Sequence, residues 1–335
     1  MALTIRNAIL HILNNDSHPS AFSEAELDID SEICEAFIQK HVRKLLDNSA
    51  NRTAVFKAES EIYNLLREYQ NGNIYFKEIT FELAKRMDAI MNRFSALPPC
   101  DMLITRVGHK SGEYLAILQL NYQAVYVHKS HKPSNGADIT ENQLITYNAL
   151  PFSSGKVEDG CLIALDGASM PINLVEKPAI IDGNSVLYFS ELFLECNSTP
   201  SKKEQAQLIN GVTTDFIGQY LNNDLKVATR LKTALIEEAT EDDGFVSIDN
   251  IASTVFEEQE DIKTQYVSSL REAGVADDLL LGQKVVKQQF AMQRIKAENG
   301  VEIRFPVALA ADENAMEIIT HSDGTVSVHF KNLNI

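Results

Sequence analysis

Hydrophobic and polar positions follow a helical period through most of the first hundred residues and a strand period after them. Apolar residues at 33–46 have the three- and four-residue spacing of a helix. A strand is predicted at 3–13, and two more helices at 59–69 and 76–94, before Pro98 and Pro99 end the helical block. Short β-rich runs at 102–107, 114–120 and 124–128 predict an antiparallel meander. Further strands are predicted at 144–147, 160–164, 173–175 and 187–194.

The second part of the chain returns to a helical period after a polar segment around Pro200. Ser201 and Glu204 have the spacing of a capping box, and helices are predicted after them, at 225–238, 248–256 and 263–273. Strands are predicted at 284–295, 301–307, 316–320 and 325–330, the last two joined by a turn that contains Asp323-Gly324. The chain therefore reads as two domains, residues 1–197 and 198–335. The expected class is α+β: helices beside a mostly antiparallel sheet, then helices followed by antiparallel strands.

Composition indicates a folded protein and limits its partners. Of 335 residues, 44% are hydrophobic and 23% are charged, which is ordinary for globular chains. No apolar run approaches a membrane span and no secretory signal is visible, so we expect a cytoplasmic protein with no membrane partner. The net charge is −17, with 47 acids against 30 bases. Uniform attraction to nucleic acid is therefore excluded, and any DNA contact must use a local basic surface.

The sequence contains no pattern that indicates catalysis or a cofactor. Phosphate-binding patterns of the GxxxxGK[ST] and GxGxxG types and the GxSxG elbow are absent. The four cysteines are too far apart for a metal knuckle or a small disulfide framework. His109, His128 and His131 could furnish metal ligands in principle, but no paired spacing supports a site. We therefore predict no enzyme activity, no cofactor and no metal.

Positive charge is concentrated in two places that could contact phosphates. The first surrounds the helix at 33–46, and the second lies near the C-terminus, where Lys284 and Arg294 would share one side of a strand and Lys287 the other. Simple solvation of a charged surface is the alternative for both. The residues predicted to contact DNA are Lys40, Arg43, Lys44, Lys284, Lys287 and Arg294, with Arg52, Lys57, Lys296 and Arg304 nearby.

Negative charge is densest at 236–261, which carries ten acids and no Lys or Arg. A solvated face and a docking surface for a basic protein are both consistent with such a run. The residues predicted to form a docking face are Glu237, Glu238, Glu241, Asp242, Asp243, Glu257, Glu258, Glu260 and Asp261.

Several segments resemble the bacterial 37-kDa nucleoid-associated protein family. They are 8–13 (AILHIL), 58–62 (AESEI), 76–87 (FKEITFELAKRM), 101–105 (DMLIT), 114–122 (YLAILQLNY), 301–309 (VEIRFPVAL) and 322–331 (SDGTVSVHFK). They are mainly apolar helix and strand positions, so the resemblance carries over no site residues. It implies a place in the bacterial nucleoid, with bacterial chromosomal DNA or nucleoid proteins as partners.

Three functions remain open from the sequence. The first is a non-enzymatic nucleoid-associated protein that reaches DNA through a basic patch, through protein partners or both; a homo-oligomer would be compatible with it. The second is an acidic DNA mimic or adaptor that occupies a basic DNA-binding protein. The third, and least favoured, is a metal-dependent enzyme acting on nucleic acid.

Overall fold

The structure, a computed structural model, describes the chain apart from residues 1–2, 16–18, 47, 111, 132–140, 152–154, 297–299, 311, 313, 322–324 and 333–335. Its contacts divide the chain into two compact units, Met1–Thr199 and Pro200–Ile335, called unit 1 and unit 2 below. Helices accompany mostly antiparallel sheets in both units, so the predicted α+β class is confirmed. The division into domains 1–197 and 198–335 stays a prediction.

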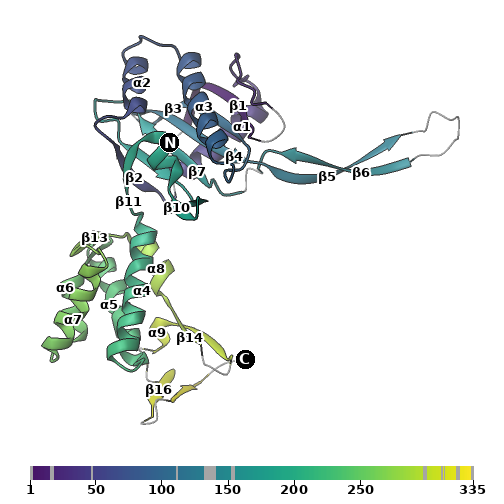
Figure 1. Cartoon of the computed structure of the whole chain (residues 1–335). Coiled ribbons are helices and arrows are strands. Elements are labelled where there is room, and N and C mark those ends of the chain that lie inside the picture. Colours follow the sequence, from purple (N-terminus) through teal and green to yellow (C-terminus); the bar gives the residue numbers. More distant parts are fainter. Residues whose placement is uncertain are drawn as a thin grey trace. The chain divides into compact units, whose positions relative to one another are not determined.

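Unit 1 is built on a seven-stranded sheet with the order β1-β3-β4-β7-β8-β2-β11, and every neighbouring pair is antiparallel (Figure 1). Small strands β9 (Ala179–Ile181) and β10 (Asn184–Val186) form a separate pair. The strands of the main sheet are β1 (Leu3–Leu13), β2 (Arg52–Phe56), β3 (Cys100–His109), β4 (Gly112–Asn121), β7 (Asp159–Ala164), β8 (Ile172–Val175) and β11 (Cys196–Thr199).

Helices cover both faces of this sheet. Helix α1 (Glu32–Leu46) packs on one face through Ile38, Val42 and Leu45, and on the other lie α2 (Glu61–Gln70), α3 (Phe76–Arg93) and the π-helical turn η1 (Phe189–Leu194). Alternate residues of a strand enter the two cores: Leu103 belongs to the α1 side and Ile104 to the other. Because both faces are buried, the central strands read as continuous apolar runs.

Two sequence predictions for unit 1 are wrong. The run predicted as a strand at 187–194 forms η1, because Phe189 and Phe193 both turn into the core, and a short apolar run does not distinguish helix from strand. The predicted third strand of the meander, β5 (Gln123–His131), leaves the main sheet, and the neighbour of β4 there is β7.

Strands β5 and β6 (Glu141–Ala149) form a two-stranded ribbon, which Figure 1 shows extending from unit 1. They pair with each other and with no other described strand. Val125 lies opposite Tyr147 and Val127 opposite Ile145, so one face of the ribbon is apolar. Tyr126 and Leu144 are 72% and 73% exposed. The ribbon therefore contributes little to the core of unit 1.

Unit 2 begins with helices that share one core. The predicted capping box is confirmed: Ser201 Oγ accepts from the amide of Glu204 at 3.2 Å, and the Glu204 carboxylate accepts from the amide of Ser201 at 2.8 Å. None of the described helices of the chain combines the length and apolar character that crossing a bilayer requires. The helices of unit 2 are α4 (Lys202–Tyr220), α5 (Leu225–Glu241), α6 (Ile248–Val255), α7 (Glu260–Glu272), α8 (Gln283–Phe290) and α9 (Val307–Ala310).

Three antiparallel strand pairs complete unit 2. They are β12 (Phe245–Ser247) with β13 (Asp278–Leu280), β14 (Met292–Lys296) with β15 (Glu302–Pro306), and β16 (Met316–Thr320) with β17 (Val326–Phe330). The last pair confirms the predicted strand pairing, although its turn lies outside the described residues. A second small core of Leu225, Phe305, Met316 and Ile318 joins α5 to these strands.

The strand predicted at 284–295 is wrong. Residues 283–290 form helix α8, and only Met292–Lys296 is a strand. Val285 and Val286 are β-branched and favour a strand locally, but α8 buries both of them with Phe290 in the helical core. Tertiary burial therefore overrides local preference in this segment.

Candidate nucleic-acid interface

Lys284 and Lys287 are exposed on the outer face of α8, one turn apart. The predicted relation between Lys284 and Arg294 fails, because Lys284 lies on a helix and Arg294 on strand β14. The structure instead brings together the two lysines of α8, while Val285, Val286 and Phe290 on the opposite face of the helix pack into the core.

Lys202, a lysine outside the predicted set, joins this pair. Helix α4 packs against α8, and Lys202 Nζ lies 4.0 Å from the point that a Cβ on Gly282 would occupy, at the start of α8. Among the described residues, no carboxylate oxygen lies within 4.0 Å of the amines of Lys202, Lys284 or Lys287. These three side chains, the α4/α8 lysines, form a local basic surface whose charge is not compensated by a close partner.

Arg294 is engaged elsewhere. It lies directly opposite Arg304 in the β14–β15 pair, and both guanidinium groups donate to Glu302, at 2.5 Å from Arg294 and 2.7 Å from Arg304. These hydrogen bonds hold the pKa of Glu302 below its ordinary value. One carboxylate thus offsets part of the charge of the two arginines and competes with any phosphate for their N–H groups.

Of the three residues predicted to contact DNA from α1, two are exposed. Lys40 is exposed, and Arg43 is exposed while donating a 3.0 Å hydrogen bond to Gln39. Lys44 is half-buried, its amine donates to the carbonyl of Gly155, and burial lowers its pKa. Nearby Arg52 lies 3.9 Å from Glu176 and donates to Ser198 at 3.2 Å. Lys44 and Arg52 therefore stabilise unit 1 and are poorly placed to reach a ligand.

The predicted acidic face is divided between two places in unit 2. Glu237, Glu241, Asp242 and Asp243 are exposed on the last turns of α5 and just after it. The second group, Glu257, Glu258, Glu260 and Asp261, is exposed beyond the C-terminal end of α6. Since α6 begins soon after α5 ends and is eight residues long, the two groups are separated by about 12 Å of helix.

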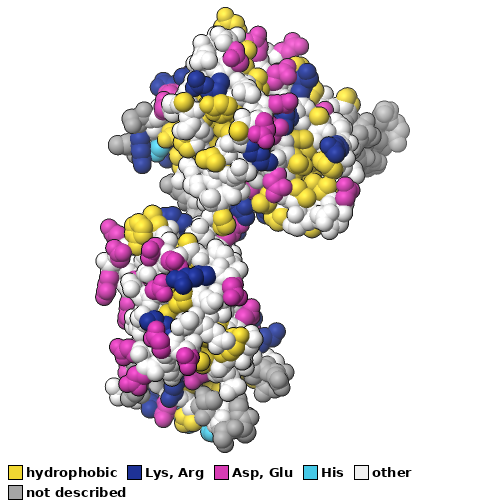
Figure 2. Space-filling model, turned by 60° about the vertical axis from the view of Figure 1, so that its left-hand side comes forward, with side chains coloured by type: hydrophobic (Ala, Val, Ile, Leu, Met, Phe, Trp, Pro, Cys, Tyr) yellow, Lys and Arg dark blue, Asp and Glu magenta, His cyan; other side chains and the backbone are white. Residues whose placement is uncertain are grey.

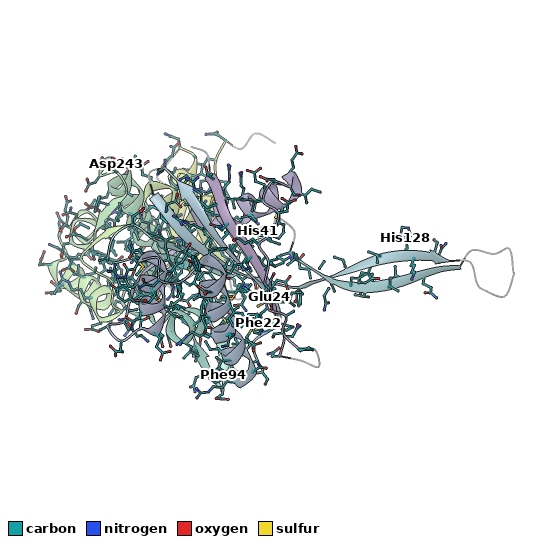
Figure 3. The ribbon with its side chains drawn as sticks, turned by 90° about the horizontal axis from the view of Figure 1, so that it is seen from above. Phe22, Glu24, His41, Phe94, His128 and Asp243 are labelled. Atoms are coloured by element: carbon teal, nitrogen blue, oxygen red, sulfur yellow. The ribbon has the colours of Figure 1, made fainter. Side chains whose placement is uncertain are left out.

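Glu238 does not belong to that face. It is half-buried and accepts hydrogen bonds from the Ser247 amide and from Asn250 Nδ2, both at 3.1 Å. Its role is to fix the start of α6. The exposed acids remain numerous even so: Figure 2 shows Asp and Glu side chains spread over the visible surface of unit 2, with few Lys or Arg among them, and Figure 3 shows Asp243 at the surface.

The histidines considered as metal ligands lie on separate elements. His109 ends β3 in the main sheet, and His128 is exposed on the ribbon (Figure 3). The side chain of His131 is outside the described part. Within the residues that the structure describes, no three His, Cys, Asp or Glu side chains are grouped to hold a metal ion.

Comparison with known proteins identifies the family. No curated protein matches the chain. The family model described as "Nucleoid-associated protein YejK" matches residues 9–335, nearly the whole chain. This agrees with the segments that suggested a 37-kDa nucleoid-associated protein, and that prediction is confirmed. The chain belongs to the nucleoid-associated protein YejK family.

Proposed function

We propose that this protein is a non-enzymatic component of the bacterial nucleoid that contacts DNA phosphates through the α4/α8 lysines. Its family supports the place in the nucleoid. The observation that carries the DNA contact is the position of Lys202, Lys284 and Lys287 at one end of unit 2, without a close carboxylate. Ammonium groups in this situation can exchange their counterions for phosphates, which is the main source of sequence-independent affinity for DNA.

The start of α4 contributes one ammonium group to this surface. Lys202 is the first residue of a 19-residue helix, and the capping box of Ser201 and Glu204 uses the Glu204 amide and places a carboxylate at this N-terminus. The attraction for a phosphate at this point therefore comes from the ammonium group of Lys202. The net charge of −17 opposes the approach of DNA, and the exposed Glu241–Asp243 run directly precedes Gly244, which contacts Gly282 at the start of α8. Binding should therefore be weak and strongly dependent on salt.

Salt titration of DNA binding tests the proposal. Retention of a DNA duplex would be measured for the wild type and for the variant Lys202→Glu/Lys284→Glu/Lys287→Glu between about 50 and 200 mM salt. We expect weaker retention and a slope of log affinity against log salt that is shallower by roughly 2 to 3. The matched control, Lys40→Glu/Arg43→Glu on α1, should change the slope much less. If only the α1 variant has an effect, the contact lies on α1 and this proposal is wrong.

A second function rests on the exposed acids after α5. Glu241, Asp242 and Asp243 are consecutive and exposed, and they could occupy the DNA-binding surface of a basic nucleoid protein. Competition distinguishes this function from the first: an acidic mimic displaces DNA from the basic partner, and Glu241→Gln/Asp242→Asn/Asp243→Asn should abolish the displacement. A homo-oligomer is compatible with both functions, and light scattering on the same preparation measures the oligomeric state.

A further inference from the structure

A large polar cleft lies in unit 2, away from the α4/α8 lysines. It has a volume of about 810 Å³ and lies between one face of α5, the end of α6 and the C-terminal strands. This volume falls within the range of pockets that bind small molecules. Neither the proposed DNA contact nor the Glu241–Asp243 acids use it, and only Glu237 of the predicted acidic face lines it.

Cations occupy one end of the cleft. Lys226 and Arg230 are one turn apart on α5, so their side chains project from the same face of the helix. Both are exposed, and among the described residues neither has a carboxylate oxygen within 4.0 Å. Arg230 makes a single long hydrogen bond of 3.5 Å to the carbonyl of Thr254. The pair can therefore turn toward an anion, and a guanidinium binds phosphate oxygens in a bidentate manner.

The rest of the cleft lining includes two acidic residues and an apolar floor. Glu237, two turns beyond Arg230 on the same face of α5, provides an acceptor about 10 Å from it. On the strand side, Glu317 is paired with Lys331 at 3.0 Å, and Lys331 first and Lys226 to a smaller extent lower the pKa of Glu317, so this carboxylate offsets only part of the positive charge of the cleft. Between these polar ends, the floor is apolar and buried, with contributions from Ala234, Val255, Met316 and Ile318.

We infer that this cleft binds a nucleoside phosphate. The phosphate would lie against Lys226 and Arg230, the base would cover the apolar floor, and Glu237 would accept hydrogen bonds from the ribose hydroxyls or from an exocyclic amine. A purely inorganic anion would leave the floor unused, and an uncharged ligand would make no charge-assisted hydrogen bond with the two cations. The same chemistry is offered by a free nucleotide and by a nucleotide within a strand, so both sources are tested below.

Binding of a fluorescent ATP analogue to the full chain, with unlabelled ATP and a short single-stranded DNA as competitors, tests the inference. We expect saturable binding that Lys226→Glu/Arg230→Glu weakens by at least about 10-fold, since each lost charge-assisted hydrogen bond alone is worth about that factor. Displacement by ATP identifies the free nucleotide as ligand. Displacement by the DNA alone identifies the strand.

Two further variants separate a site in the cleft from a general effect of charge. Ala310→Phe adds bulk to the cleft lining without changing charge, and it should also weaken binding by about 10-fold. Lys129→Glu makes the same change of charge at an exposed position of β5, outside the cleft and the α4/α8 lysines, and should change the affinity less than about 2-fold. Absence of saturable binding, or an equal effect of Lys129→Glu and the cleft variants, overturns the inference. Because Lys226→Glu/Arg230→Glu should leave duplex retention by the α4/α8 lysines nearly unchanged, failure here is distinguishable from failure of the proposed function.

Discussion

Gly244 and Gly282 contact each other through their backbones. The amide of Gly282 donates a 2.9 Å hydrogen bond to the carbonyl of Gly244, and a Cβ on Gly244 would lie 2.5 Å from the Cα of Gly282. Gly244 follows α5 and Gly282 immediately precedes α8, so this contact fixes α8 against the end of α5. It also determines where Lys284 and Lys287 stand.

Replacing Gly244 should destabilise unit 2. Gly244 has a φ of +93°, so Gly244→Ala adds backbone strain to the clash with Gly282. We expect a loss of about 2 to 4 kcal/mol in the free energy of unfolding, measured by urea denaturation. Gly274→Ala is the matched control, because Gly274 also has a positive φ, +86°, but nothing lies within 4 Å of its added Cβ. It should cost only about 1 kcal/mol. Equal losses in both variants would show that the Gly244–Gly282 contact is unimportant.

Glu302→Gln should strengthen binding to DNA. In the wild type the Glu302 carboxylate bonds to both Arg294 and Arg304, and its removal exposes two neighbouring guanidinium groups to phosphate. We expect several-fold tighter retention of duplex DNA and a salt slope that is steeper by about 1. Glu257→Gln makes the same change in net charge at an exposed position beyond α6. If the two variants behave alike, only net charge matters and the arginines make no contact.

Local features of the fold were predictable from the sequence. The cap of α4 needs only Ser201 and Glu204, three residues apart, and the apolar spacing of α3 shows directly in its buried residues Phe76, Ile79 and Leu83. The buried face of α4 is harder to predict from the sequence: Leu208 and Tyr220 are each 40% exposed, while Ile209 and Ile217 enter the core. A helix that is apolar on more than one side does not reveal which side another helix will cover.

The candidate interface depended on contacts that no local pattern contains. Lys202 and Gly282 are 80 positions apart and meet only because α4 packs on α8. Similarly, Glu238 looks like its exposed neighbours in the sequence, and only the structure shows its bonds to Ser247 and Asn250. The pattern of β5 resembles that of a sheet strand, because β-propensity does not specify which strand will be its neighbour.

Asp159→Asn should stabilise the protein at neutral pH and leave it unchanged in acid. Burial raises the pKa of Asp159 to about 6, although its carboxylate accepts a 3.0 Å hydrogen bond from the Lys177 amide. The ordinary pKa of an unfolded Asp is about 3.9, so the folded state binds the proton more tightly. The wild type therefore loses stability as the pH rises from about 4 to 6, and above that range the loss is complete.

Asparagine resembles the protonated side chain and avoids this loss. At pH 8 the variant should be more stable than the wild type by up to about 2 to 3 kcal/mol, and near pH 3.5 the two should agree. Urea denaturation at both pH values measures the difference. Glu59→Gln removes an exposed carboxylate of unit 1 and should have little effect at either pH. A difference between Asp159→Asn and the wild type that does not depend on pH would contradict the assignment.

Removing the β5–β6 ribbon should leave unit 1 folded. Gln123 and Ala149 are paired across the base of the ribbon, where opposite Cα atoms lie about 5 Å apart, so a short Gly-Ser linker can replace residues 123–149. Among the described residues of this segment, none belongs to either core of unit 1. An isolated two-stranded hairpin is at best marginally stable, so the ribbon adds little to the rest of the fold.

Thermal unfolding followed by circular dichroism measures this expectation. The deletion variant should unfold within about 3 °C of the wild type, since no apolar group of either core is removed. Leu118→Ala, in the buried strand β4, is the positive control and should cost about 2 to 5 kcal/mol. A deletion that lowers the midpoint as much as Leu118→Ala would mean that the ribbon is held against the protein, by unit 1 or by another copy. Light scattering would then separate these cases. If the ribbon holds a second copy of the chain, the deletion variant should have half the molar mass of the wild type; if unit 1 holds the ribbon, the molar mass should fall only by that of the deleted residues.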